Sequence, residues 1–321
     1  ESQQCWTRLH SACIGGHVRE IGADMRPLVD ARTDMGNTPL HFACAEANSE
    51  RVIYRLVEMG GNLLAPNTNG HTPLHVAAAH QPPAVVGTLL LKTSAKAVDV
   101  QDDDGSTPLR WAIEQSRTPM ATSTYLLAAG ASVHTRDQDG DTPLHYAARE
   151  GHFKLFKMLV DAGGYTEACN GRGFSPIHSA CKVGNEEFVA SCLRCHATMP
   201  QTTLSRGTLL HVAVRNGSQA VVQKMIDNFG SAAMEVCDKY GRTPLMVAIA
   251  NEKFDIADIL GGANANVSDS SCLDLGSDGS LSDLLDSDSD IDASDKEEEE
   301  LFSCRPVHRS CHSLYRSQLA A

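Results

Sequence analysis

The chain lacks the features that mark membrane proteins, nucleotide-binding enzymes and nucleic-acid readers. It has no apolar stretch long enough to cross a bilayer and no signal peptide at its beginning. It contains neither a Walker-type phosphate loop nor a dinucleotide-binding glycine fingerprint. No nucleic-acid reader motif is present, and the net charge is −13. We therefore expect a cytoplasmic or nuclear protein that does not bind membranes or nucleic acid directly.

A catalytic or metal-binding constellation is also missing. A cysteine–histidine pair for nucleophilic catalysis would need an oxyanion site and a cleft, and the sequence indicates neither. Residues 192–196 match the c-type haem attachment string, but they fall on a predicted core helix and its end. The cysteines and histidines between residues 304 and 312 fit no standard zinc spacing. We expect no enzyme activity, no cofactor and no bound metal.

The chain is instead rich in copies of the tetrapeptide Thr-Pro-Leu-His. Successive copies start 31 to 35 residues apart. A period of this size is typical of stacked-repeat architectures. Intact copies start at Thr38, Thr72 and Thr142, and altered copies start at Thr7, Thr107, Ser175, Thr208 and Thr243.

The regular unit spanning residues 137–164 shows how each part of the repeat begins and ends. Its first four residues form a predicted turn in which Gly140 takes a positive φ. Thr142 can cap a helix, and Pro143 suits the first helical position because its missing N–H costs nothing there. Gly151 ends this short helix. A second, longer helix follows.

Apolar residues give both predicted helices a buried face. The short helix carries Leu144 and two small alanines, which allow close packing. The second helix has apolar residues at helical spacing. These residues are Phe153, Phe156, Leu159 and Val160.

The run Asp-x-x-Gly-x-Thr-Pro-Leu-His resembles the ankyrin repeat, and the resemblance covers roughly residues 5–266 in about eight units. It implies an all-α solenoid with β-hairpin tips, in which stacked units share one core. We expect this array to occupy residues 1–267 and a disordered tail to occupy residues 268–321. The resemblance also implies that the motif histidine bonds locally and joins hairpin to helix. This role falls on His10, His41, His75, His145, His178 and His211.

Several units depart from the pattern. Arg110 and Met246 stand where histidine is expected, and Met246 lies in the terminal unit, where repeats are atypical. The Pro82-Pro83 pair and Pro119 are predicted to start second helices or to distort the loops before them. The chain opens at Glu1 rather than methionine, so we expect a fragment or processed form with room for an upstream domain.

Eleven cysteines are scattered through the chain rather than clustered as in a disulfide scaffold. Cys44, Cys181 and Cys192 fall on helical positions of the repeats. We interpret them as small core residues of a protein in a reducing compartment.

The tail carries nearly all of the acidity. Residues 268–300 have a net charge of −12, residues 301–321 have +3, and the rest of the chain has −4. Two interpretations stay open for the acidic segment: a solubilising tail, or a recognition and phosphorylation segment in which leucines interrupt the acids. The predicted phosphosites, each followed by acidic residues, are Ser282, Ser287, Ser289 and Ser294.

The positions flanking each motif predict a change of charge along the repeats. Units four and five offer mainly acids: Asp103, Asp104, Glu114, Asp139, Asp141 and Glu150, against Arg149. Units six to eight offer cations, together with two aromatic residues predicted to be exposed hot spots. Ordinary surface charge is the alternative interpretation. The predicted partner-binding residues are Arg172, Phe174, Lys182, Arg206, Arg215, Lys239, Tyr240 and Arg242.

We interpret the chain as a monomeric, non-enzymatic scaffold or adaptor in signalling, whose protein partner contributes an acidic segment. The chain's own tail would compete for the same basic surface. One alternative is an inhibitor-of-NF-κB-like transcriptional regulator. Eight units exceed that family's usual number, however, and residues 268–300 contain no proline for a PEST-type signal. Another alternative is the substrate-targeting part of a larger enzyme.

Overall fold

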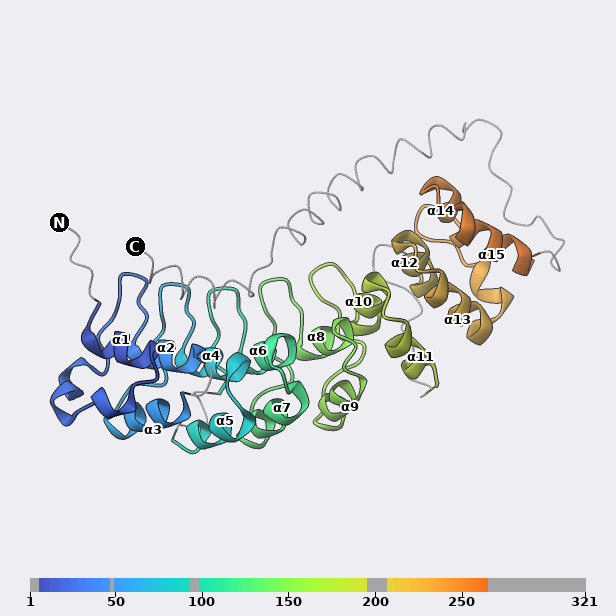
Figure 1. Cartoon of the computed structure of the whole chain (residues 1–321). Coiled ribbons are helices and arrows are strands. Elements are labelled where there is room, and N and C mark those ends of the chain that lie inside the picture. The colour runs from blue at the N-terminus through green and yellow to red at the C-terminus, as the bar shows by residue number, and fades with distance from the viewer. Residues whose placement is uncertain (1–5, 47–48, 93–97, 195–206, 265–321) are drawn as a thin grey trace. The chain divides into compact units, whose positions relative to one another are not determined.

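The structure is a computed structural model, and it describes residues 6–46, 49–92, 98–194 and 207–264. Figure 1 shows that helices dominate these residues and that most occur in pairs. The described ranges contain no β-strand, and none of their helices is long and apolar enough to span a membrane. The predicted all-α fold class is confirmed.

A short helix starts at each copy of the motif. Thr142 is extended (φ −98°, ψ 166°) and Pro143 is the first helical residue, as its fixed φ favours. The other short helices also begin directly after the first motif residue, with arginine in place of proline at residue 8 and leucine at residue 209. The short helices are α1 Arg8–Ile14, α2 Pro39–Ala45, α4 Pro73–His80, α6 Pro108–Gln115, α8 Pro143–Arg149, α10 Pro176–Val183, α12 Leu209–Asn216 and α14 Pro244–Ala250.

A second helix follows every short helix except the first. Pro83 and Pro119 each begin one, which is one of the two outcomes predicted for these prolines. After α1 the chain forms only the 3-10 turns η1 Val18–Glu20 and η2 Ala23–Leu28, because Pro27 interrupts the segment. A further 3-10 turn, η4, spans Ser231–Met234. The second helices are α3 Glu50–Glu58, α5 Pro83–Leu90, α7 Pro119–Ala128, α9 Phe153–Asp161, α11 Glu186–Arg194, α13 Gln219–Phe229 and α15 Phe254–Asn264.

The core lies between neighbouring repeats. The motif leucine Leu144 is buried, as are its counterparts Leu40, Leu74 and Leu109. On α9 the buried residues are Leu155, Phe156 and Leu159. Of the apolar residues predicted at helical spacing, Phe153 and Val160 are half-buried, whereas Leu155, which was not among them, is fully buried.

The hairpin tips are tight turns joined side by side. Asp137 N–H donates to the carbonyl of Asp141 (3.1 Å), and Gly140 between them has φ +78°. A Cβ on Gly140 would lie 2.7 Å from the backbone nitrogen of Gly171 in the next hairpin. Only glycine allows this approach. Gly171 N–H donates to the carbonyl of Asp139 (2.8 Å) and links the two tips.

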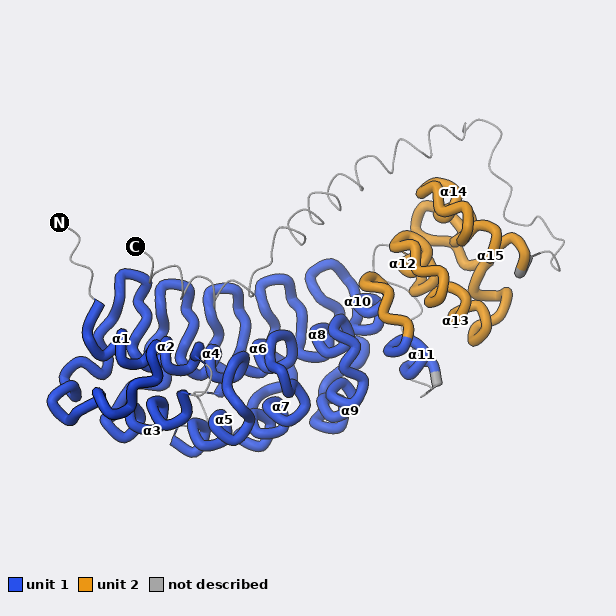
Figure 2. The backbone as a smooth tube through the Cα atoms, viewed as in Figure 1, with its two compact units in different colours: residues 1–180, 187–199 blue, residues 181–186, 200–321 orange. Residues whose placement is uncertain are grey.

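The chain divides into two compact units (Figure 2). Unit 1 comprises residues 1–180 and 187–199, and unit 2 comprises residues 181–186 and 200–321. In unit 1 neighbouring short helices pack on one another, for example α2 on α4 and α4 on α6. In unit 2, α12 packs on α14 and α13 on α15. A single array over residues 1–267 stays a prediction.

Candidate protein-binding surface

The motif histidines are committed to hydrogen bonds inside the fold. In the regular repeat, Thr142 N–H donates to His145 Nδ1 (3.1 Å), and Thr142 Oγ1 lies 2.9 Å from the same nitrogen. His145 Nε2 lies 2.9 Å from the carbonyl oxygen of Phe174 in the next repeat. A backbone N–H needs an acceptor and a carbonyl needs a donor, so Nδ1 is unprotonated and Nε2 carries the proton.

The same bonds recur along the chain. The local bond from the cap residue's N–H to Nδ1 measures 3.0–3.3 Å for His10, His41, His75, His178 and His211. Sequence reasoning predicted this bond but missed the link from Nε2 to the next repeat, which the constant period could have suggested. This link measures 2.9–3.3 Å for His10, His41, His75 and His211.

Burial keeps these imidazoles neutral. It lowers the pKa of His41, His75 and His178 to about 4 in each case. A neutral ring with both nitrogens engaged, as in His41 and His75, has no lone pair to offer a metal or a substrate. In His178 only Nδ1 is engaged, and its buried Nε2 has no hydrogen-bond partner among the described residues. The motif histidines therefore have a structural role.

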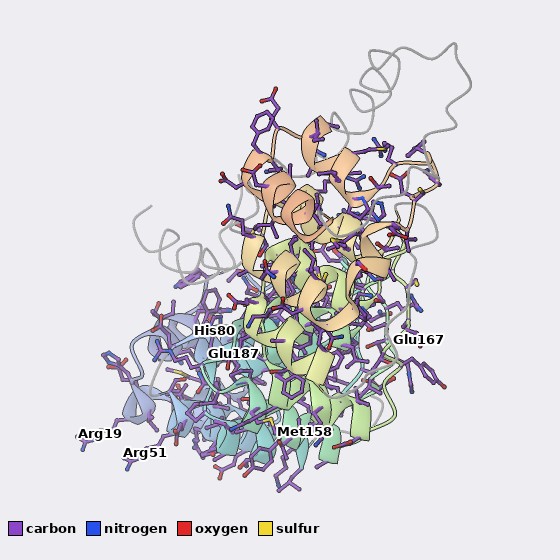
Figure 3. The ribbon with its side chains drawn as sticks, turned by 90° about the vertical axis from the view of Figure 1, so that its right-hand side faces the viewer. Arg19, Arg51, His80, Met158, Glu167 and Glu187 are labelled. Atoms are coloured by element: carbon purple, nitrogen blue, oxygen red, sulfur yellow. The ribbon has the colours of Figure 1, made fainter. Side chains whose placement is uncertain are left out.

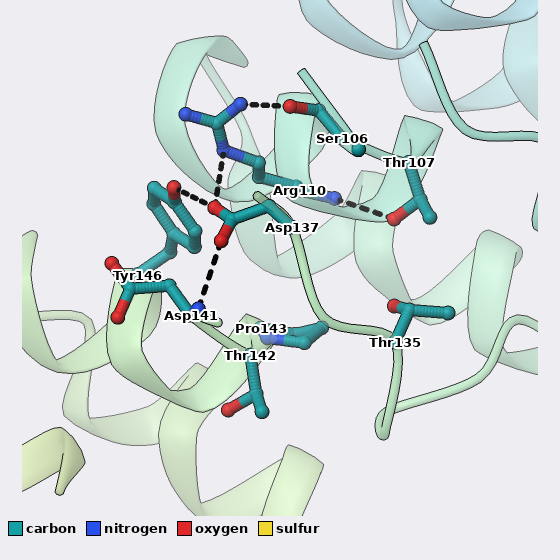
Figure 4. Close-up of a pocket in the computed structure, with 10 residues that line it drawn as sticks. Ser106, Thr107, Arg110, Thr135, Asp137, Asp141, Thr142, Pro143 and Tyr146 are labelled. Carbon is teal, nitrogen blue, oxygen red and sulfur yellow. Dashed lines mark hydrogen bonds and ion pairs between the residues drawn. The ribbon is translucent and has the colours of Figure 1, made fainter. Parts of the chain in front are cut away.

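Arg110, which replaces the motif histidine, forms a different junction between repeats (Figure 4). Its guanidinium carbon lies 4.3 Å from the ring centroid of Tyr146, and that of Arg149 lies 4.5 Å from the same centroid. Arg110 Nε is 4.0 Å from Asp137, whose carboxylate also accepts a hydrogen bond from the Tyr146 hydroxyl. Arg149 pairs with Asp141 at 2.6 Å.

The Arg110 cluster, defined as Arg110, Asp137, Asp141, Tyr146 and Arg149, leaves no room for a ligand. Burial raises the pKa of the Asp137 carboxyl, although the hydrogen bond from Tyr146 opposes this. The hollow lined by Arg110, Asp137, Asp141 and Tyr146 measures ≈ 10 Å³, about the room that one water needs. The cluster thus takes over the joining role of the missing histidine.

Two of the predicted partner-binding residues, Lys239 and Tyr240, are exposed at a hairpin tip of unit 2. The Tyr240 side chain is 41% exposed. Lys239 Nζ lies 4.7 Å from its ring centroid, and the Arg242 guanidinium lies 4.8 Å from it. An aromatic ring with cations beside it is a suitable contact for a carboxylate-bearing partner.

Two other predictions were wrong about exposure. Phe174 is not an exposed tip aromatic: it is only 5% exposed, because its hairpin position turns it inward, where its ring lies 6.1 Å from that of His178. Arg242 is buried as well, and its guanidinium binds Asp238 at 3.0 Å. This acid lies within the basic region and was overlooked.

The remaining predicted residues are separated. Arg172 lies half-buried on a hairpin of unit 1. Lys182 and Arg215 lie half-buried in the last turns of α10 and α12, in unit 2. Arg206 and the phosphosites Ser282, Ser287, Ser289 and Ser294 lie outside the described residues.

The predicted acid excess in units four and five is partly neutralised. Asp103 and Asp139 are exposed at tips, as expected. Asp141, however, is buried against Arg149, and Glu114 lies 3.6 Å from Arg110. Burial, with the charge of Glu114, raises the pKa of the Glu150 carboxyl.

The interpretation of three cysteines as core residues is confirmed. Cys44, Cys181 and Cys192 are buried, and no disulfide joins them. Cys192, the first residue of the haem-like string, lies on α11, as predicted from the sequence. The last two residues of the string, Cys195 and His196, lie outside the described residues. Within the described ranges, no group of three or more His, Cys, Asp or Glu residues could hold a metal ion.

Comparison with known proteins identifies the repeat. A family profile described as "Ankyrin repeats (3 copies)" matches residues 44–137, 77–170, 121–197 and 177–269. Rabankyrin-5 of Mus musculus is 33% identical over 90 residues, which is 28% of this chain and 7% of that protein. The chain thus matches only a small part of this curated relative.

The fold also matches a solved structure. The crystal structure of the ankyrin repeat domain of Bcl-3, described as a unique member of the IκB protein family, covers 79% of this chain and 99% of its own. The TM-score is 0.54 and the sequence identity is 23%. At this identity the likeness concerns the fold.

Proposed function

This chain belongs to the ankyrin-repeat family, and from that premise we propose that it is a non-enzymatic scaffold or adaptor for a protein partner. The motif side chains support this proposal because they are buried and form hydrogen bonds within the fold, as His145 does. The side chains that reach solvent at the hairpin tips differ from repeat to repeat. Buried motif residues that stay the same and exposed tip residues that vary are suited to the recognition of a protein surface.

The partner surface that we propose centres on Lys239 and Tyr240. The observation that carries it is the exposed ring of Tyr240 with a cation on it. Lys182 and Arg215 extend the proposal to the ends of α10 and α12 in unit 2. This chemistry suits a partner segment that alternates acids and apolar residues, and opposite charge would speed the encounter.

Affinity capture with the full chain tests this surface. The double variant Lys239→Glu/Tyr240→Ala is compared with wild type and with Arg51→Glu, which reverses an exposed charge on α3 that extends away from the ribbon (Figure 3). We expect captured partners to be lost from the double variant alone. Equal capture by all three proteins would place binding elsewhere.

A second candidate is an inhibitor-of-NF-κB-like regulator. The repeats followed by an acidic segment favour it, and so does the fold likeness to Bcl-3, although that likeness carries the fold only. A pull-down with a Rel-type dimer separates the two candidates. Retention of the dimer by wild type, and its loss from the tip variant, would favour this candidate.

A third candidate is the targeting part of a larger enzyme. The short match to Rabankyrin-5 is compatible with repeats inside a longer protein. The reading frame upstream of Glu1 decides it: a catalytic domain there would make the repeats a substrate-recognition arm. We place all of these activities in the cytoplasm or nucleus.

We also propose phosphorylation of the acidic segment by an acidophilic kinase. The sites are Ser282, Ser287, Ser289 and Ser294, and each phosphate would add almost two negative charges. Such charges would strengthen any contact of this segment with the Lys239 tip. Mass spectrometry of the protein from cells tests it: recovery of these serines only in unmodified form would contradict the proposal.

A further inference from the structure

The last described repeat exposes an apolar residue at a position that is buried in every preceding repeat. Ile249 of α14 occupies the seventh position of the repeat, counting the motif threonine as the first. The residues at this position in the preceding repeats are at most 1% exposed, whereas Ile249 is 52% exposed. Those buried counterparts are Cys13, Cys44, Ala78, Ile113, Ala148, Cys181 and Val214.

Neighbouring positions extend this face. Leu245 and Met246 are only half-buried, although the motif leucine and histidine are buried in the regular repeats. Phe254, the first residue of α15, is 62% exposed. Its counterpart Phe153 contacts Phe188 of the following repeat, with ring centroids 6.0 Å apart. Phe254 thus occupies a position that contacts the next repeat when one is present.

The second helix of this repeat also leaves open space at one position. Gly261 stands where other repeats carry large residues such as Leu56 and Ile226. A Cβ built on Gly261 would have no atom within 4 Å. A glycine inside a helix weakens it, and this position gains from glycine if another segment approaches closely.

Terminal repeats of a solenoid normally present a polar outer face, because an apolar one promotes association. We call the apolar residues Leu245, Met246, Ile249 and Phe254 the terminal face. We propose that residues 273–291 of the same chain dock on this terminal face and cap the repeats. This inference does not depend on the proposed function, because it concerns the end of the repeats and not the tip contact with a partner.

Chain connectivity favours this occupant. The helix α15 ends at Asn264 in the same repeat, about nine residues before Leu273. Nine extended residues reach up to about 30 Å, roughly three times the spacing of packed helices. The tether also gives the segment a high effective concentration at the face.

The chemistry of the segment matches the face and its surroundings. Its aliphatic residues supply the apolar contacts, and its aspartates can approach the exposed Lys239 at the tip of the same repeat. Asp255 and Asp258 are exposed on α15 and repel the acids, so docking favours the α14 side of the face. The aliphatic residues are Leu273, Leu275, Leu281, Leu284, Leu285 and Ile291.

Hydrogen exchange of the full-length protein, read by mass spectrometry, tests the proposal. We compare wild type with Ile249→Asn, which makes the terminal face polar, and with the control Leu91→Asn. Leu91 is 84% exposed at the end of α5 in unit 1. We expect slowed exchange at residues 273–291 in wild type and in the control. In Ile249→Asn the exchange there should become about tenfold faster.

A reciprocal variant makes the result specific. Replacing Leu281, Leu284 and Leu285 by serine in the full chain should speed exchange in α14, while unit 1 keeps its wild-type pattern. Exchange of residues 273–291 at the rate of a free chain in wild type would overturn the proposal. Protection that disappears on dilution would overturn it in favour of a second copy. Neither outcome would bear on partner capture by the Lys239 tip, which is measured separately.

Discussion

Leu144 shows what one motif residue contributes. Its side chain is buried between repeats, and a Cβ on Gly164 would lie 2.8 Å from its Cδ1, so the glycine makes room for the leucine. Leu144→Ala would leave a cavity that this close-packed site cannot fill. We expect a loss of about 2–5 kcal/mol in the free energy of unfolding, measured by urea titration. Leu91→Ala, at an exposed leucine, should change it by less than about 0.5 kcal/mol. A wild-type transition for Leu144→Ala would mean that the repeat register is wrong.

Arg110 is the residue at which the motif is broken and repaired. Removing its guanidinium in Arg110→Ala takes a cation from the Tyr146 ring and from the buried Asp137 carboxylate. We expect a loss of about 1–3 kcal/mol. Adding Asp137→Asn should recover part of this, because the unpaired charge is then gone. Fully additive losses in the double variant would show that the two residues do not interact.

At the scale of the helices, local chemistry made most of the fold predictable. Where the motif carries Thr-Pro, this pair sets the backbone at the start of the short helix, so α2, α4 and α8 begin at their prolines. The first repeat departs from the predicted unit because its second segment carries Pro27, which leaves 3-10 turns in place of a helix. Pro27 could have indicated this missing helix from the sequence, but the regular period of the repeats led us to expect a complete unit.

Side-chain exposure at the tips was less predictable than helix position. Phe174 and Arg242 both directly precede a motif copy, and whether this position faces inward depends on the hairpin and on neighbouring repeats. A single sequence identifies the position but not its neighbours. Arg242 also illustrates pairing at short range, since Asp238 stands four residues before it and the turn brings the two together. Among the predicted partner-binding residues that the structure describes, Lys239 and Tyr240, at the outermost turn, are the two that are exposed as expected.

The histidine bonds make the stability of the stack depend on pH. His41, His75 and His178 have a pKa of about 4 in the fold, because burial disfavours the charged ring, against 6.5 for a free imidazole. Between these values the unfolded chain binds more protons, so stability falls as pH falls from 6.5 toward 4. This difference in pKa corresponds to a loss of roughly 3 kcal/mol in the free energy of unfolding for each histidine once the pH is below both values.

Urea titrations at a series of pH values measure this loss. High salt is the control: it screens surface charge effects, but it leaves the effect of burial in place. The raised pKa values of the Asp137 and Glu150 carboxyls act in the opposite direction at the acidic end. A free energy of unfolding that is constant from pH 6.5 to pH 4 would contradict the assigned neutral histidines.

At the scale of the whole molecule, charge is concentrated at one end of the sequence. The segment 268–300 carries −12, whereas residues 1–267 carry only −4. The acidic residues therefore follow directly on the repeat that offers the exposed Lys239 and Tyr240. We propose that a segment tethered this close competes with an acidic partner. Its advantage would depend on ionic strength, because the Debye length is only about 8 Å at physiological salt.

Deleting residues 268–321 tests this competition. A labelled acidic peptide with the sequence of residues 277–295 serves as the ligand, and its affinity is measured by fluorescence anisotropy for the full and the shortened chain. We expect tighter binding to the shortened chain at low salt, because the tethered competitor is gone, and no difference at high salt. Lys239→Glu in the shortened chain should weaken the peptide again, whereas Arg51→Glu should not. Equal affinities of the two chains at low salt would rule out competition by the tail. The affinity difference between the full and the shortened chain could also disappear when both carry Lys239→Glu. That result would locate the competition at the hairpin tip of the last repeat, which also carries the terminal face that the same segment is proposed to cover.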